Sequence, residues 1–368
     1  MTDRLFGRRL EERAAIRRFV ERALAPHAAA WEARGRFPRS ILRTCASAGL
    51  LTLDPWRAAL VAEELPRAES LGFALSVFVQ GNLVAPMLDT LATGDQRTAY
   101  LRPVLAGRAC GAVAVSEPGA GSDYGALITT ATRQRGQITL EGVKTYITNA
   151  AIADFFIVAA REVAGGAARA LTLVIVPSRA RGVRVRTLPS LGLRTSAMGE
   201  IRLARCRVPL QHVLGEQGTA FGSLQVALDR ERLFGALAAV SWADHALQKT
   251  IAWARERRAF GQPLVRHQAV RHRIAELATR LEAARQLNYA TFRRWVDHED
   301  VAREIAMIKV FSYEVAQDTI DACLQLHGGA GYLDSHWVSR FYRDARALTI
   351  AAGTPEVMKD LIAAYLRL

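Results

Sequence analysis

The spacing of apolar residues changes twice along the 368-residue chain. From residue 1 to about 109, apolar residues recur three and four positions apart, which is the period of amphipathic helices. From about 110 to 215 the period shortens to two, as in half-buried strands. Beyond 216 the helical period returns in long stretches, at 218–256, 263–295, 299–327 and 355–367. The pattern predicts a mainly α chain with a β middle domain, divided into 1–109, 110–215 and 216–368.

The middle segment contains runs that alternate apolar and polar residues between Gly, Pro and Asn turns. These runs are "ACGAVAVSE", "ALITTATRQ", "QITLEGVKTYIT", "FFIVAARE", "LTLVIVP" and "GVRVRTL". Each is expected to form a strand. The longest apolar runs, "FFIVAA" and "LTLVIV", are far shorter than the roughly 20 residues that a membrane-crossing helix needs. We therefore expect no membrane insertion.

The chain carries a formal net charge of +14. Its 45 arginines and 4 lysines are spread along the whole length, and no nucleic-acid-binding motif accompanies them. This skew is more typical of a coding bias than of a binding surface, so no nucleic-acid partner is predicted. A basic surface would still favour anionic small molecules or an acidic protein.

The cysteines are far apart, form no CxxC pair and have no histidine cluster nearby: Cys45, Cys110, Cys206 and Cys323. They are expected to be reduced, packed thiols, and no metal site is predicted. The Arg-rich N-terminus carries Asp3, Glu11 and Glu12, whereas transit peptides avoid acids. No secretory apolar region is present, so the prediction is a cytoplasmic protein.

Three segments could hold a polar ligand. "SEPGAGSDYG" (116–125) offers close backbone approach at Gly119 and Gly121 and a hydroxyl at Ser122. Its G-x-G-x-x-x-G spacing does not match a Rossmann motif, and a tight β-turn is an equal alternative. "LQLHGGAGY" (324–332) ends a long helix, with more glycines than C-capping needs and with His327 expected to be packed. "RERRAFGQPLVRHQ" (255–268) contains arginines that could hold a phosphate.

A carboxylate stands in an otherwise apolar helical stretch, "VALDRERLFGAL" (226–237). Glu231 lies there between Arg230 and Arg232. One interpretation is a structural ion pair, because buried charges are normally paired. The other is a general base that takes a proton from a substrate. Desolvation would raise its pKa and the flanking arginines would lower it, so the sequence leaves the direction open.

The order of the motifs is specific, although each is weak alone. "SEPGAGSD", "KTYITNA", "LGLRTSAMGEIRLARCRVP", "LGEQG", "RRAFGQPLVRHQ", "QLHGGAGY", "RDAR" and "AAGTPEV" together resemble the acyl-CoA dehydrogenase family. The resemblance implies an N-terminal helical domain, a β-barrel-like middle domain and a C-terminal four-helix bundle. It also implies one FAD per subunit, a homodimer or homotetramer, and an acceptor such as an electron-transfer flavoprotein.

The resemblance assigns cofactor contacts that are divided between two subunits. Residues expected to line the flavin are Val113, Val115, Ser116, Gly121, Ser122, Tyr146, Ile147 and Thr148. Residues expected to reach the diphosphate and adenosine from the neighbouring subunit are Arg257, Phe260, Gln268, Gln325, Leu326, Gly328 and Gly329. Thr354 and Glu356 match positions that touch the same cofactor. Substrate contacts are expected at Ser122, Asp229, Arg232, Ala352 and Gly353.

The family's reaction desaturates an acyl thioester. A carboxylate removes the α-proton while a hydride passes from the β-carbon to flavin N5. In many members the base is a Glu just before the terminal "GT", but here Ala352 stands there. In the isovaleryl-CoA dehydrogenase branch a small residue precedes the "GT", and the base lies in an "L-x-x-E-R-L" segment. Both features occur in this chain, which favours Glu231 as the catalytic base.

The predicted function is therefore FAD-dependent α,β-dehydrogenation of an acyl thioester. The acyl or aminoacyl group is held on CoA or on a carrier protein, and the main-chain N–H of Ala352 is expected to polarise its carbonyl. Two alternatives stay open. One is a flavin-dependent monooxygenase of the same fold, and the other is a non-catalytic assembly paralogue.

Overall fold

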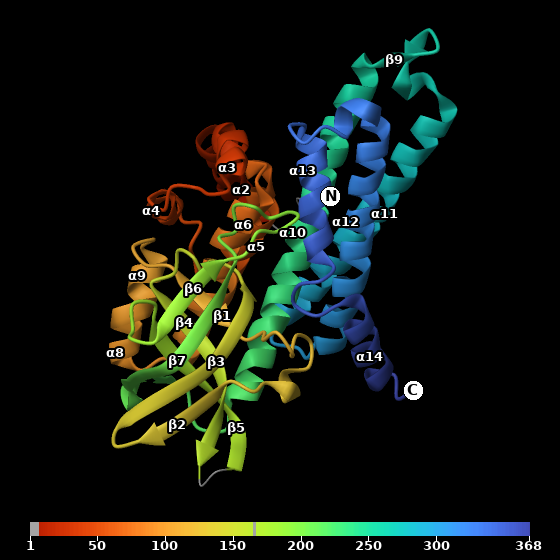
Figure 1. Cartoon of the computed structure of the whole chain (residues 1–368). Helices are drawn as coiled ribbons and strands as arrows, with labels where there is room; N and C mark the ends of the chain where they lie inside the picture. Colours follow the sequence, from red (N-terminus) through yellow and green to blue (C-terminus); the bar gives the residue numbers. More distant parts are fainter. Residues whose placement is uncertain (1–6, 165–166) are drawn as a thin grey trace.

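The computed structural model describes residues 7–164 and 167–368 and has three parts (Figure 1). The N-terminal helices and a β-sheet lie on one side of the long helix α10 (Ala220–Glu256). The remaining C-terminal helices lie on the other side and form a bundle with α10. The predicted fold class, helical, then β, then helical, is confirmed.

The N-terminal part consists of short helical segments, many of which follow one another without a break. They are η1 (Gly7–Arg9), α2 (Leu10–Phe19), η2 (Val20–Leu24), η3 (Ala25–His27), α3 (Ala28–Arg34), α4 (Ile41–Ser47), α5 (Pro55–Glu64), η4 (Leu65–Ala68), α6 (Leu71–Val79), η5 (Gln80–Val84), α7 (Ala85–Leu91), α8 (Gly94–Gln96), η6 (Arg97–Leu101) and α9 (Arg102–Leu105). Helix α5 begins at Pro55 because the Asp54 carboxylate accepts hydrogen bonds from the N–H groups of Trp56 and Arg57. Helix α5 packs against α10 and so joins this part to the bundle.

One helical run in the described residues, Leu71–Leu91, is long and apolar enough to cross a membrane. The sequence pattern predicted this stretch as helical but not as a single long apolar run, because polar residues interrupt it at Ser76, Gln80 and Asn82. Inside the fold, 89% of its most apolar window is buried. The run therefore lies within the hydrophobic core, and Gln80 is bonded there to the backbone of Gly111.

The β part forms one sheet in the order β6-β7-β3-β2-β4-β5-β8, with β1 paired to β4. The elements are β1 (Gly111–Ala114), η7 (Tyr124–Ala126), β2 (Thr130–Gln134), β3 (Gln137–Ile147), β4 (Phe155–Ala164), β5 (Ala167–Pro177), β6 (Val183–Thr187), β7 (Gly199–Pro209), η8 (Leu210–His212) and β8 (Val213–Leu214). Strands β1 and β2 run parallel to β4, and the other pairs are antiparallel. Alternate residues of β4 enter two apolar clusters, so both faces of this strand are buried.

The six predicted strands are present, and β7 is a long strand that the pattern did not predict. Arginines occupy most of its exposed positions, and Arg205, with a φ of +50°, interrupts its alternation. Its pairing with β3 shifts register at the same place, between Leu140 and Gly142. The bulge therefore hides the period of two that would otherwise have identified the strand.

The bundle contains α10 and four further helices: α11 (Gln268–Val296), α12 (Ala302–Gly331), α13 (Trp337–Leu348) and α14 (Pro355–Tyr365). The short strands β9 (Arg258–Ala259) and β10 (Gln262–Pro263), followed by η9 (Leu264–Arg266), lie at its far tip (Figure 1). Gly328 breaks α12 with a φ of +58°, at the glycine pair where the sequence predicts the helix end. Helix α13 was not predicted, because only a five-residue turn separates it from α12.

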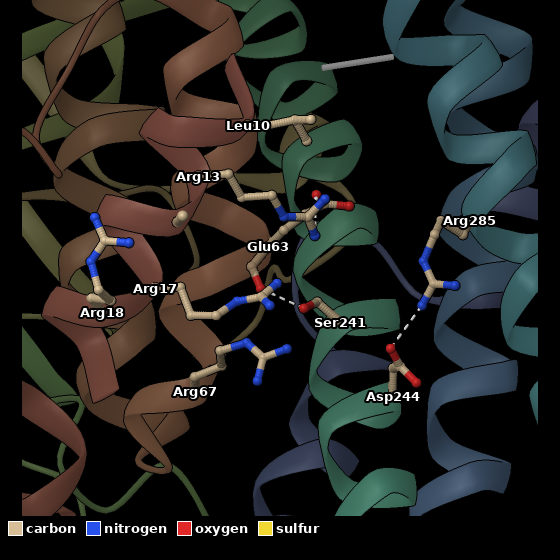
Figure 2. Close-up of a pocket in the computed structure, with 10 residues that line it drawn as sticks. Leu10, Arg13, Arg17, Arg18, Glu63, Arg67, Ser241, Asp244 and Arg285 are labelled. Carbon is tan, nitrogen blue, oxygen red and sulfur yellow. Dashed lines mark hydrogen bonds and ion pairs between the residues drawn. The ribbon is translucent and has the colours of Figure 1, made fainter. Parts of the chain in front are cut away.

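Two groups of ion pairs, one within the N-terminal part and one within the bundle, flank a cavity of about 570 Å³ that both parts line (Figure 2). Glu64 is 1% exposed and binds Arg13, Arg17 and Arg67 at 2.6, 2.8 and 2.9 Å. On the bundle side, Asp244 binds Arg285 at 3.0 Å. The carboxylates around this cavity are engaged by arginines, so these ion pairs have a structural role.

Candidate active site

Another cavity, of about 580 Å³, lies between the sheet and the first half of α10, and we call it the large cavity. The predicted residues that line it are Val113, Val115, Ser116, Gly121, Ser122, Tyr146, Ile147, Thr148, Glu231, Ala352, Gly353 and Thr354. They come from β1 and its following loop, the end of β3, α10 and the loop after α13. The structure therefore brings together four segments that are far apart in the sequence.

A buried ion pair holds the glycine-rich loop on one wall of the large cavity. Lys144 Nζ lies 2.7 Å from Glu117 Oε1, and the side chains are 0% and 1% exposed. Glu117 also accepts hydrogen bonds from the N–H groups of Ile128 (2.7 Å) and Thr129 (2.9 Å). Burial opposes ionisation of Glu117, but these donors outweigh it and hold the pKa of the carboxyl below its usual range. Glu117 lies in "SEPGAGSD" and Lys144 in "KTYITNA", and the sequence did not predict that they pair.

The walls of the large cavity suit a flat, polar cofactor. The hydroxyl groups of Ser116, Ser122 and Thr148 make no hydrogen bond within the described part of the chain. A Cβ added at Gly121 would meet nothing within 4 Å, so the space beside this backbone is open. Tyr146 has a φ of +60°, and its ring is 67% exposed. Free hydroxyls, open space and an exposed ring fit the isoalloxazine of FAD.

The carboxylate of Glu231 lies where the large cavity meets a second, inner cavity. The carboxylate of Glu231 makes no hydrogen bond or ion pair with any other described residue. The guanidinium of Arg230 lies over the Phe234 ring, 4.6 Å from the ring centroid, and so does not pair with Glu231. Burial raises the pKa of Glu231, and the nearby charges of Lys309 and Arg232 offset this only in part. The pKa of Glu231 is therefore shifted upward, and no structural ion pair engages its carboxylate within the described residues.

The inner cavity, of about 70 Å³, extends from Glu231 between α6, α10 and α12. Its walls are mostly apolar, with Leu71, Leu75 and Phe78 on the α6 side. Two polar side chains of α12, Lys309 and Tyr313, complete it. The sequence pattern placed all of these residues in helices and singled out none, because their shared cavity joins separate helices.

The loop after α13 is tied to α10 by Arg232. Its Nε donates to the carbonyl of Ala352 (2.9 Å), and its NH1 group binds Asp229 (2.8 Å). Ala352 has a φ of +57°, and its N–H makes no hydrogen bond within the described residues. Asp229 and Arg232 thus brace the loop and do not line either cavity. Their predicted contact with the substrate stays a prediction.

The second group of predicted cofactor residues lies elsewhere in the chain. Arg257, Phe260 and Gln268 are at the far tip of the bundle, beside β9 and away from the sheet (Figure 1). The segment from Gln325 to Gly329, including Leu326 and Gly328, ends α12 near this tip, where His327 stacks on Trp253 at 5.1 Å. Phe260 is 98% exposed, and an added Cβ would meet nothing at Gly328 or Gly329. Within one chain these residues do not reach the large cavity, and Glu356, on α14, does not line it either.

Two minor predictions concern buried side chains. The cysteines Cys45, Cys110, Cys206 and Cys323 are free and buried. His327 is packed, with its Nδ1 2.7 Å from the Cys323 carbonyl. Both predictions are confirmed.

Comparison with known proteins decides the family. The N-terminal, middle and C-terminal domains of acyl-CoA dehydrogenases match residues 9–108, 112–206 and 219–366. The chain belongs to the acyl-CoA dehydrogenase family. Family members bind FAD, and the curated relatives of this chain are oxidoreductases that act on CH–CH groups.

Individual relatives resemble the chain over nearly its whole length. The long-chain specific acyl-CoA dehydrogenase of Sus scrofa is 31% identical over 95% of this chain and 84% of its own. The caffeyl-CoA reductase–Etf complex subunit CarC of Acetobacterium woodii is 31% identical over 91% of both chains. A crystal structure of acyl-CoA dehydrogenase from Geobacillus kaustophilus has a TM-score of 0.92 and 31% identity, covering 97% of both chains.

Proposed function

We propose that this chain is an FAD-dependent dehydrogenase that forms a Cα–Cβ double bond in an acyl thioester, with Glu231 as the base. The observation that carries the proposal is the unpaired carboxylate of Glu231 at the junction of two cavities. A carboxyl whose pKa is raised by burial is suited to general-base work near neutral pH.

The residues of the site divide the chemistry between them. FAD bound in the large cavity would supply the acceptor for the hydride that leaves Cβ. Glu231 takes the α-proton on its carboxylate, and the free N–H of Ala352 donates to the thioester oxygen, where negative charge develops. Arg232 keeps that N–H in place through its bond to the Ala352 carbonyl. The apolar inner cavity holds the acyl group and excludes water, which strengthens these interactions.

Three finer assignments belong to the same proposal. Ala352 before the "GT" and Glu231 on α10 support placement in the isovaleryl-CoA dehydrogenase-like branch. The net charge of +14 suits either CoA or an acidic carrier protein as the group that delivers the acyl thioester. The A. woodii relative, which is named as part of an Etf complex, supports an electron-transfer flavoprotein as the acceptor.

Anaerobic bleaching of the bound flavin by acyl thioesters tests this function. We expect at least one saturated acyl-CoA or carrier-bound acyl group to bleach the flavin and to be recovered as the α,β-unsaturated thioester. A protein that purifies without flavin would be an assembly paralogue. Rapid reaction of the reduced protein with oxygen, with hydroxylation of an added aromatic compound, would identify the monooxygenase instead.

The two separated groups of cofactor residues predict that FAD is shared between subunits. Arg257→Ala should release FAD and loosen the dimer, because an exposed guanidinium at the bundle tip would bind the diphosphate of the cofactor held mainly by another chain. Flavin absorbance per subunit and light-scattering mass measure both effects. Arg102→Ala, at an exposed arginine of the N-terminal part, serves as the control. A flavin-loaded Arg257→Ala monomer would contradict the shared site.

A further inference from the structure

Two oppositely charged side chains face the inner cavity from different helices. Glu231 projects from α10 and Lys309 from α12, and both line this cavity. Lys309 is 3% exposed, which is rare for an ammonium without a carboxylate partner in contact. Within the described residues it makes no ion pair shorter than 4 Å, and the same is true of Glu231.

The contacts that Lys309 does make are to neutral groups. Its Nζ donates to the carbonyl of Leu348 at 2.8 Å, at the end of α13. It also lies 3.5 Å from the centroid of the Tyr313 ring. Neither contact neutralises the charge, and a buried charge without a counter-charge is costly. Glu231 is the acidic group with which Lys309 interacts electrostatically.

The other charges around Glu231 are already matched or turned away. Arg232 is paired with Asp229 at 2.8 Å, so its charge is largely compensated. Arg230 faces the Phe234 ring on another side of α10. The remaining titratable groups that interact with Glu231 are two phenols, Tyr124 and Tyr313. Lys309 is therefore the cation that faces Glu231 without being compensated by another carboxylate.

We propose that Lys309 is a positioning residue whose ammonium is the counter-charge that keeps the Glu231 carboxylate ionised beside the inner cavity. The inference rests on the proposed function, in which Glu231 must be ionised to take the α-proton. An ammonium held at a distance suits this task better than a direct ion pair. A direct pair would occupy the carboxylate oxygens that must reach the α-proton.

The charge of Lys309 is itself sensitive to pH. Burial lowers the pKa of Lys309 to about 7, although Glu231 opposes this shift. The carboxyl and the ammonium therefore titrate as a coupled pair. An opposite charge nearby favours the ionised carboxylate, so removing it should raise the pKa of Glu231 further. The acid side of the pH profile of flavin reduction should then move to higher pH.

Two variants separate the charge from the hydrogen bond. Lys309→Gln can still donate to the Leu348 carbonyl but carries no charge, whereas Lys309→Arg keeps the charge across the whole pH range. We expect the acid limb of anaerobic flavin reduction to rise by about one pH unit or more in Lys309→Gln. In Lys309→Arg it should stay at or below the wild-type position. A purely structural lysine would instead lower the rate equally at every pH and lower the melting temperature.

Infrared difference spectroscopy measures the protonation of Glu231 without turnover. Each protein is compared with its Glu231→Gln counterpart, so that the protonated carboxyl band of Glu231 can be titrated directly. The band should persist to higher pH in Lys309→Gln than in wild type. An unmoved band together with an unmoved acid limb would overturn the role of Lys309. This result is distinct from failure of the proposed function, which would show as wild-type flavin reduction in Glu231→Gln.

Discussion

Flavin reduction by a saturating acyl thioester is expected to fall by about 10²–10⁴-fold in Glu231→Gln, because an amide cannot accept the α-proton. The side chain keeps nearly the same shape, and no hydrogen bond or ion pair of Glu231 within the described residues is lost. FAD content and substrate binding should therefore be unchanged. The measurement is anaerobic stopped-flow bleaching of the flavin, with the melting temperature followed in parallel.

The stability of the same variant distinguishes a base from a structural carboxylate. The pKa of Glu231 is raised in the folded protein, so its contribution to stability is fully present only below the unfolded pKa and is lost as pH rises. At neutral pH the buried carboxylate is thus a cost to the fold. Glu231→Gln should melt at or above the wild-type temperature. If Glu231 were instead a member of a buried ion pair, Glu231→Gln would lower the free energy of unfolding by about 3–5 kcal/mol.

A second carboxylate provides the reciprocal test. Ala352 and Glu231 line the same two cavities, so adding Ala352→Glu to Glu231→Gln should restore part of the flavin reduction. Recovery should be partial, because the larger side chain crowds the acyl cavity and Ala352 has a φ of +57°. A folded, flavin-loaded Glu231→Gln protein that bleaches at the wild-type rate would end the assignment of Glu231 as base.

The position of Glu231 could be predicted from sequence, but its electrostatic surroundings could not. From the sequence, burial would raise its pKa and the flanking arginines would lower it, so the direction stayed open. In the structure Arg230 turns to an aromatic ring and Arg232 pairs with Asp229. The cation that does face the same cavity, Lys309, comes from another helix far along the chain. Side chains that are neighbours in sequence on a helix point in different directions. Only the packing of α10 against α12 therefore shows which cation lies close enough to affect the Glu231 carboxylate.

The loop that lines the large cavity shows the same limit. The sequence predicted that "SEPGAGSD" would approach a cofactor, and Ser116, Gly121 and Ser122 do line the cavity. Glu117 within that motif points inward, to a lysine on β3. Composition and spacing identify glycines and hydroxyls that are free to bind, but a buried pair is defined by the pairing of separate strands and loops.

Removing Lys144, the partner of Glu117, is expected to produce the largest loss of stability among these variants. Lys144→Met leaves the Glu117 carboxylate buried without its counter-charge and should cost about 3–5 kcal/mol in the free energy of unfolding. The lost Lys144 hydrogen bond to the Val115 carbonyl, 2.8 Å long, adds to the effect. Because Glu117 also holds the N–H groups of Ile128 and Thr129, the loop on the cavity wall should loosen and FAD affinity should fall with stability.

Denaturant unfolding and flavin retention measure the two effects, and an exposed pair supplies the control. Lys359 lies 3.3 Å from Glu314 with side chains 60% and 46% exposed, so Lys359→Met should cost less than about 1 kcal/mol. The double variant Glu117→Gln with Lys144→Met should be more stable than Lys144→Met alone, because no unpaired charge then remains buried. If Lys144→Met were to unfold like Lys359→Met and keep its flavin, the pair would not be what holds the loop. The cavity wall would then depend on the hydrogen bonds that the Glu117 carboxylate accepts from the N–H groups of Ile128 and Thr129.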